Sequence, residues 1–234
     1  MMVVPLTTVL VLAIDTATPA VTAGVVQLDA DAAPRTLAQR VTIDAKAHGE
    51  LLIPHLREAL AEAGRTMADV DAIVCGSGPG PFTGLRVGMV TAAALGQALG
   101  RPVYPVPTVD AIAVEARSGH RLLVATDARR REVYWAAYDA DGGRVEGPHV
   151  DKPADLAEKL PSLDVASAAG QGAEMYADVL DLPIALAPFP SPHGLVAVAA
   201  AALLAGAEPD PMTPLYLRRP DAVVPTGRKR VTQP

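Results

Sequence analysis

The apolar positions in the first part of the chain predict a group of β-strands. Three stretches combine apolar and β-branched residues and are separated by residues that favour turns. They are Val9–Ile14, Val21–Leu28 and Thr36–Ile43. The first stretch ends in Asp15 and runs into the sequence Thr-Ala-Thr-Pro, which predicts a turn between the first two strands.

Helical spacing replaces this pattern between Lys46 and Ala63. Three leucines there recur every four residues and lie on one stripe: Leu52, Leu56 and Leu60. Gly64 follows as a typical helix stop. Pro54 lies within this stretch, so the helix either starts late or bends at that residue.

A glycine-rich loop leads from a buried-type strand, Asp71–Cys75, into a second helix. The loop reads GSGPGPFTGLR, and its candidate phosphate-binding residues are Gly76, Gly78 and Gly80. Its spacing matches neither the Walker motif nor the dinucleotide fingerprint, and its two prolines lack the N–H groups that a phosphate would use. A tight turn with Thr83 as the helix N-cap is therefore at least as well supported as a ligand site.

The helix after this loop is apolar on nearly every side, since Thr91 and Gln97 are the only polar residues between Val87 and Gly100. Small residues recur along it every four positions: Gly84, Gly88, Ala92, Gly96 and Gly100. A smooth stripe of this kind lets a second helix approach closely. That second helix is either the neighbour at Lys46–Ala63 or a helix from another chain.

The second half of the sequence repeats part of the first at a shift of 112 residues, which aligns Asp127 with Asp15 and Val133 with Val21. Two unrelated hairpins would also align moderately well, but the shared position of the aspartate at the end of a strand favours a duplication. Each carboxylate is a candidate for holding Mg²⁺ or orienting a water between two lobes. The alternative is that each one caps its own turn through a side-chain hydrogen bond.

A duplication predicts an α/β fold of two lobes, at residues 1–106 and 107–222. The helical pattern at Thr108–Ala116 would connect these lobes. A basic tail at residues 223–234, with Arg228–Arg230, would either lie extended over a lobe or lack order.

Composition narrows the functional classes. The chain has 20 Lys and Arg against 26 Asp and Glu, a net charge of −6, which speaks against a surface that binds nucleic acid by itself. The single cysteine excludes an internal disulfide and suggests a reducing compartment. No apolar run is long enough to span a membrane and the start lacks signal-peptide features, so we expect a cytoplasmic protein without a membrane partner.

Histidine spacing argues against a metal on the first helix. His48 and His55 stand seven residues apart, whereas two histidines that share a metal on a helix need a spacing of four. The residue at that spacing from His48 is Leu52. Cys75 ends a buried-type strand and is typical of an inert core thiol.

Four segments together resemble the bacterial TsaB (YeaZ) family, a glycoprotease-like branch of the actin, hexokinase and Hsp70 superfamily. They are VLAIDTAT, HGELLIPHL, GSGPGPFTGLRVG and YLRRPDA, and the resemblance runs from about Val9 to Ala222. It implies a duplicated actin-like (ASKHA) fold of two lobes, with mixed sheets flanked by helices. Pro81 departs from the serine that many relatives carry at this position.

The resemblance also implies a function. The family helps to make N6-threonylcarbamoyladenosine, the modified base beside the anticodon in tRNAs that read codons beginning with A. This chain would be a non-catalytic scaffold for a TsaD-type paralogue, whose His-x-x-x-His metal pair is broken here by Leu52. The interface with that paralogue would lie on the two helices, at Leu52, Leu56, Leu60, Thr83, Gly84, Gly88, Met89, Ala92 and Gly96.

The expected partners are the TsaD-type paralogue, a TsaE-type ATPase, and a second copy of the chain when the paralogue is absent. The chain alone is expected to hold no cofactor, although ATP or ADP could lie at the interface between partners, and tRNA would be bound only through the complex. The alternative function is that of an enzyme, a metal- or ATP-dependent hydrolase or kinase of the actin-like superfamily, acting at Asp15 and Asp127.

Overall fold

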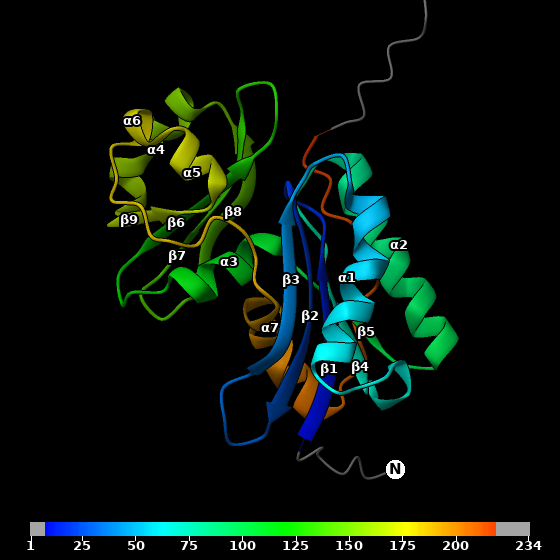
Figure 1. Cartoon of the computed structure of the whole chain (residues 1–234). Helices are drawn as coiled ribbons and strands as arrows, with labels where there is room; N and C mark the ends of the chain where they lie inside the picture. Colours follow the sequence, from blue (N-terminus) through cyan, green and yellow to red (C-terminus); the bar gives the residue numbers. More distant parts are fainter. Residues whose placement is uncertain (1–7, 219–234) are drawn as a thin grey trace, which may run out of the picture.

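The computed structural model describes residues 8–218 and forms two lobes, each built on one mixed β-sheet (Figure 1). The first sheet has the strand order β3-β2-β1-β4-β5. Its strands are β1 (Thr8–Asp15), β2 (Ala20–Asp29), β3 (Arg35–Ile43), β4 (Ala72–Gly76) and β5 (Val103–Val106). Strand β1 pairs antiparallel with β2 and parallel with β4, so the sheet is mixed, as predicted.

The second sheet repeats this arrangement in the order β8-β7-β6-β9. Its strands are β6 (Leu122–Asp127), β7 (Val133–Tyr138), β8 (Arg144–Asp151) and β9 (Ser167–Ala169). The central strand β6 again pairs antiparallel with the next strand and parallel with a later one, which confirms the predicted duplication. Asp15 pairs with Thr22 in the first hairpin and Asp127 with Val133 in the second, so the second turn is shorter by one residue.

Helices cover both faces of the first sheet. The helices are α1 (His48–Glu62), α2 (Phe82–Leu99), α3 (Thr108–Ala116), α4 (Pro153–Leu163), α5 (Gln171–Met175), α6 (Ala177–Leu180) and α7 (Pro192–Ala205), and a 3₁₀ turn, η1, spans Met67–Asp69. Helices α1 and α2 lie on one face of the sheet, and α7 lies on the other (Figure 1). Within residues 8–218 no helix is long and apolar enough to cross a membrane.

The core follows from the near-continuous apolar run of β1, whose residues from Val9 onward are all buried. Successive side chains of a strand point to opposite faces. Leu12 and Ile14 therefore pack under α1 and α2, while Val11 and Ala13 pack under α7. A strand that is buried on both faces needs this apolar run in place of an alternating pattern.

Helix α7 packs on the first lobe, although it follows the strands of the second lobe in the sequence. By sequence this helix belongs to the predicted second lobe, residues 107–222, yet it packs on the first sheet, predicted as residues 1–106. The connecting helix Thr108–Ala116 is present as predicted and packs against α7. The basic tail at 223–234, with Arg228–Arg230, lies outside the described residues.

The structure corrects two predictions about where the helices of the first lobe begin, and it shows a capping box at the 3₁₀ turn η1. The backbone N–H of Thr66 donates to Asp69 Oδ2 at 2.7 Å within a capping box. Helix α1 begins at His48, ahead of Pro54, so a late start at the proline is wrong. The N-cap assigned to Thr83 is also wrong, because α2 begins at Phe82 after Pro81 and no side chain caps it.

Candidate functional site

Asp15, the first candidate catalytic residue, is completely buried at the end of β1. Its Oδ1 accepts a hydrogen bond from the Ala17 N–H at 2.8 Å, and its Oδ2 accepts one from Thr108 Oγ1 at 2.6 Å. Burial raises the pKa of Asp15 to about 6, against the lowering effect of these hydrogen bonds. A side-chain carbon on Gly76 would lie 1.7 Å from Asp15 Oδ2, so the glycine closes tightly over the carboxyl group.

This geometry gives Asp15 a structural task. The bond to Ala17 is the turn-capping bond that was the alternative to catalysis. The bond to Thr108 ties the end of β1 to the start of α3. Both carboxylate oxygens are thus engaged by groups of the chain itself, and the arrangement anchors the connection between the lobes.

Asp127 makes the equivalent turn in the second lobe. Its Oδ1 accepts from the Arg129 N–H at 2.8 Å, and its Oδ2 lies 3.3 Å from the guanidinium of the same arginine. Both predicted aspartates therefore cap their own turns, which supports the capping alternative. Among residues 8–218 there is also no group of three His, Cys, Asp or Glu side chains placed to hold a metal ion.

The histidines and the cysteine of the first lobe are separate core residues. His48 Nε2 lies 2.8 Å from the Thr18 carbonyl oxygen, and His55 Nε2 lies 2.9 Å from Thr42 Oγ1, so the two rings bind different strands or turns. Cys75 is fully buried, and burial raises the pKa of its thiol, which disfavours the reactive thiolate.

The glycine loop is packed against the β1–β2 turn. The Gly78 N–H donates to Thr108 Oγ1 at 3.2 Å, and a side-chain carbon on Gly80 would lie 2.2 Å from the Ala17 carbonyl oxygen. The candidate phosphate-binding residues Gly76, Gly78 and Gly80 thus approach the chain's own backbone or side chains. The geometry supports the tight-turn interpretation of this loop.

The small-residue stripe of α2 faces inward, which favours a packing partner within the same lobe over a helix from another chain. A side-chain carbon on Gly88 would lie 2.5 Å from Thr16 Oγ1, and one on Gly96 would lie 2.3 Å from Val103 Cγ2. Thr16 Oγ1 donates to the Gly84 carbonyl oxygen at 2.7 Å and accepts from the Gly88 N–H at 2.8 Å. The stripe therefore packs on the turn after β1 and on β5, and Gly84 also lies against His48 of α1, where a side-chain carbon would come within 3.3 Å of the imidazole ring.

Most of the residues proposed for the partner interface are accordingly buried inside the chain: Leu52, Leu56, Leu60, Gly84, Gly88, Met89, Ala92 and Gly96. These side chains lie mainly beneath the surface of the single chain, although Met89 still lines a surface pocket beside Val90. Thr83 is the exception, because it is exposed in the first turn of α2. Periodicity located the stripe correctly, but spacing alone does not say which side of a helix meets the sheet.

The opposite sides of α1 and α2 are exposed, and we call these two sides together the outer α1–α2 face. It consists of Ile53, Arg57 and Ala61 on α1 and of Thr83, Arg86, Val90, Ala93, Ala94 and Gln97 on α2. Val90 is 65% exposed and Ile53 is 41% exposed. The sequence of α2 also held the signal for this face, because the positions between the small residues of the inner stripe include apolar residues.

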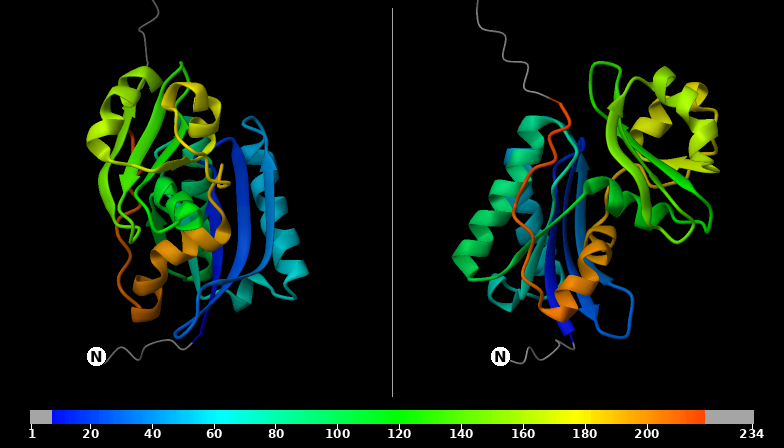
Figure 2. Two further views of the ribbon diagram at one scale, coloured as in Figure 1. Left: turned by 90° about the vertical axis from the view of Figure 1, so that its left-hand side faces the viewer. Right: turned by 180° about the vertical axis from the view of Figure 1, so that it is seen from behind.

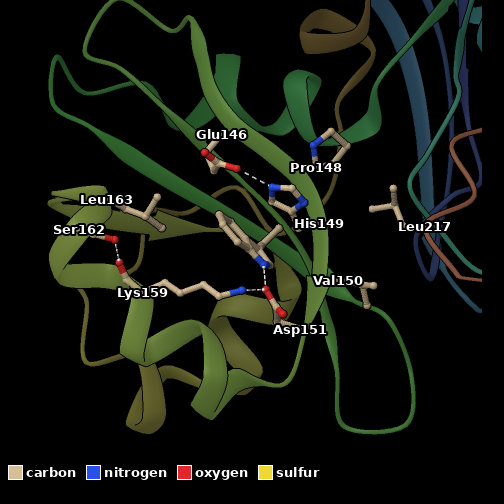
Figure 3. A pocket seen from close by; sticks show the side chains of 10 residues that line it. Glu146, Pro148, His149, Val150, Asp151, Lys159, Ser162, Leu163 and Leu217 are labelled. Atoms are coloured by element: carbon tan, nitrogen blue, oxygen red, sulfur yellow. Dashed lines mark hydrogen bonds and ion pairs between the residues drawn. The ribbon is translucent and has the colours of Figure 1, made fainter.

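A groove of about 470 Å³ in the second lobe is lined by polar groups that are already paired (Figure 3). Asp151 Oδ2 accepts from Trp135 Nε1 at 2.7 Å and from Lys159 Nζ at 2.5 Å. His149 Nε2 lies 2.6 Å from Glu146 Oε1. The two bonds of Asp151 hold β8 against β7 and α4, whereas the His149–Glu146 contact lies within β8.

Comparisons with known proteins agree with this architecture. The family model described as TsaD, tRNA N6-adenosine threonylcarbamoyltransferase, matches residues 37–206. An uncharacterized protein of Mycobacterium tuberculosis is 54% identical over 212 residues, 91% of this chain and 93% of that protein. The Escherichia coli tRNA threonylcarbamoyladenosine biosynthesis protein TsaB is 33% identical over 165 residues, 65% of this chain and 67% of TsaB. YeaZ from Pseudomonas aeruginosa superimposes with a TM-score of 0.72 at 30% identity, over 89% of this chain and 100% of YeaZ.

Two lobes with matching mixed sheets and flanking helices define a duplicated α/β protein. The resemblance seen in the sequence is confirmed by these comparisons. The chain belongs to the threonylcarbamoyltransferase (TsaD) family and, within it, to the TsaB, or YeaZ, type.

Proposed function

We propose that the chain is the non-catalytic scaffold subunit of the complex that adds threonylcarbamoyl to the adenosine beside the anticodon of tRNA. In this role it binds and activates a TsaD-type paralogue, which carries the catalytic metal. Two observations support this division of labour. The Asp15 carboxyl group has no solvent contact, and Leu52 stands where the resemblance puts a metal-binding histidine in the paralogue.

The observation that carries the proposal is the composition of the outer α1–α2 face. A helix that buries one side in its own core normally shows polar and charged residues on the other side. Helix α2 instead exposes Val90, and Arg86 is its only charged residue. Ile53 adds a second exposed apolar side chain on α1. Apolar residues on two adjacent helices are typical of a surface that a partner covers.

The same face would serve more than one partner. In the complex the TsaD-type paralogue covers it, and a second copy of the chain covers it when the paralogue is absent. A TsaE-type ATPase and a bound ATP or ADP then join at the interface, and tRNA is bound through the complex. The net charge of −6 supports that last point, because a chain that binds tRNA by itself needs a basic surface.

The substitution Val90→Asp tests the interface. A charge buried without a partner costs about 3–5 kcal/mol, which weakens affinity for the TsaD-type paralogue roughly 150- to 4,000-fold. Val179→Asp is the matched control, because Val179 is a 44% exposed valine on α6 of the second lobe. Isothermal titration calorimetry of the purified chains measures both variants.

Unchanged affinity of the Val90→Asp variant would remove the outer α1–α2 face as the interface. The scaffold role has a separate test in the isolated chain. ATP turnover that disappears with Asp15→Asn would show an enzyme acting at this aspartate and would contradict the non-catalytic role.

A further inference from the structure

The last described residues form a strap, Met212–Arg218, which belongs to neither sheet and to no helix. After α7 ends at Ala205, the chain turns back and runs beside α2 towards the second lobe (Figure 2). The strap contains Tyr216, Leu217 and Arg218, which begin the YLRRPDA segment of the family resemblance. The proposed function assigns no task to this segment.

The strap is bonded to the first lobe at the glycine loop and the start of α2. The Leu215 N–H donates to the Ser77 carbonyl oxygen at 2.8 Å. The Tyr216 ring stacks on Phe82 with 5.2 Å between ring centres, and its hydroxyl accepts from Arg86 Nε at 2.8 Å. The Arg86 guanidinium lies 3.6 Å from the centre of the Phe82 ring, so the three side chains form one stacked group.

The strap is also bonded to the second lobe. Arg218 Nη1 donates to the Ala128 carbonyl oxygen at 3.1 Å, and its other terminal nitrogen forms an ion pair with Glu132. Both acceptors belong to the turn between β6 and β7. The Arg218 side chain is only 24% exposed, and a planar guanidinium that binds two acceptors fixes both position and orientation.

Helices α3 and α7 form a different junction between the lobes. Helix α3 is bonded to the second sheet, because Tyr138 Oη donates to Asp110 Oδ1 at 2.7 Å. Helix α7 packs on the first sheet and on α3. The His193 ring on α7 lies 2.8 Å from Glu115 Oε1 on α3, which adds a polar bond to this packing.

We infer that the strap is a clamp that fixes the angle between the two lobes, with Tyr216 and Arg218 as its anchoring residues. A rotation of one lobe about the α3–α7 junction moves the β6–β7 turn relative to α2, and this motion pulls Arg218 from its two acceptors. The clamp concerns bonds within the chain and stands whether or not the proposed function holds. It also links the lobe angle to the outer α1–α2 face, because Tyr216 holds Arg86 of that face.

The experiment measures the distance between the lobes directly. Spin labels are placed at Ala32→Cys, exposed between β2 and β3, and at Glu158→Cys, exposed on α4. Cys75 is the only natural cysteine and is fully buried, so it stays unlabelled. Labelled protein is diluted with unlabelled full-length chain, so that pulsed electron–electron double resonance reports distances within one molecule.

Two variants release the two ends of the clamp, Arg218→Ala and Tyr216→Ala. The matched control is Arg40→Ala, which removes an arginine with two ion pairs inside the first lobe and similar exposure, 33%. We expect a shifted and broader interlobe distance in both clamp variants and the unchanged distribution in the control. Circular dichroism melting confirms that every variant is folded. If either clamp variant is folded and still shows the interlobe distance distribution of the natural chain, the inference is overturned.

Discussion

The buried Asp15 carboxyl group predicts an unusual dependence of stability on pH, which Asp15→Asn isolates. Asparagine keeps the shape of the side chain and an oxygen that accepts from the Ala17 N–H. Its amide nitrogen donates to Thr108 Oγ1, since a hydroxyl group both donates and accepts. The substitution therefore removes the titration and keeps the contacts.

The direction in which stability changes with pH follows from the pKa of Asp15 in the unfolded and in the folded chain. Asp15 titrates near 3.8 in the unfolded chain and at about 6 in the folded one, so the folded state binds a proton more readily. Below about pH 3 both states are protonated and burial costs nothing through this group. As the pH rises from about 3 to 7 the unfolded state ionises first, and folding loses about 3 kcal/mol of stability in total.

Urea unfolding from pH 4 to pH 8 measures this effect, with the fluorescence of Trp135, the single tryptophan, as the signal. The free energy of unfolding of the natural chain, minus that of the Asp15→Asn variant, should fall by about 2–2.5 kcal/mol over this range and level off above about pH 7. A difference that stays constant, or that rises with pH, would refute the assignment of Asp15 as a buried anchor with a raised pKa.

Two further substitutions test packing. Gly88→Ala puts a carbon 2.5 Å from Thr16 Oγ1 and should lower the unfolding free energy by about 1–3 kcal/mol. Gly49→Ala in α1 is the control, because the added carbon meets nothing within 4 Å and should not destabilise the protein. Equal urea midpoints for the two variants would contradict the inward orientation of the stripe. Trp135→Phe removes the bond to Asp151 and should cost about 1.5–3 kcal/mol, since the acceptor is charged. Calorimetric melting measures it, and an unaltered melting temperature would show that this bond does not hold β8.

The strands and the duplication could be predicted because both leave a direct mark on the sequence. A strand buried on both faces needs an apolar run, and the strand-end aspartate recurs because it caps the same turn in each copy. The single-residue difference between the two turns left no comparable signal, because nothing in the local pattern fixes which residues pair across a hairpin.

The orientation of α2 could not be predicted from its own residues. Its inner stripe and outer face are both apolar, so periodicity leaves two solutions, and the choice depends on Thr16, far away in the sequence. The contact between Asp15 and Thr108 and the anchoring of the strap by Arg218 are likewise long-range pairings. Residues that meet only after the lobes assemble carry no local signature.

The place of α7 bears on how this chain is made. Val11 and Ala13 lie on the face of the first sheet that α7 covers, with Ala111 of α3 beside it, and α7 begins at Pro192. A ribosome synthesises the N-terminal end first. The first lobe therefore emerges with much of one apolar side open to water, and it is completed only by α7, a helix that is translated after every described strand of both sheets.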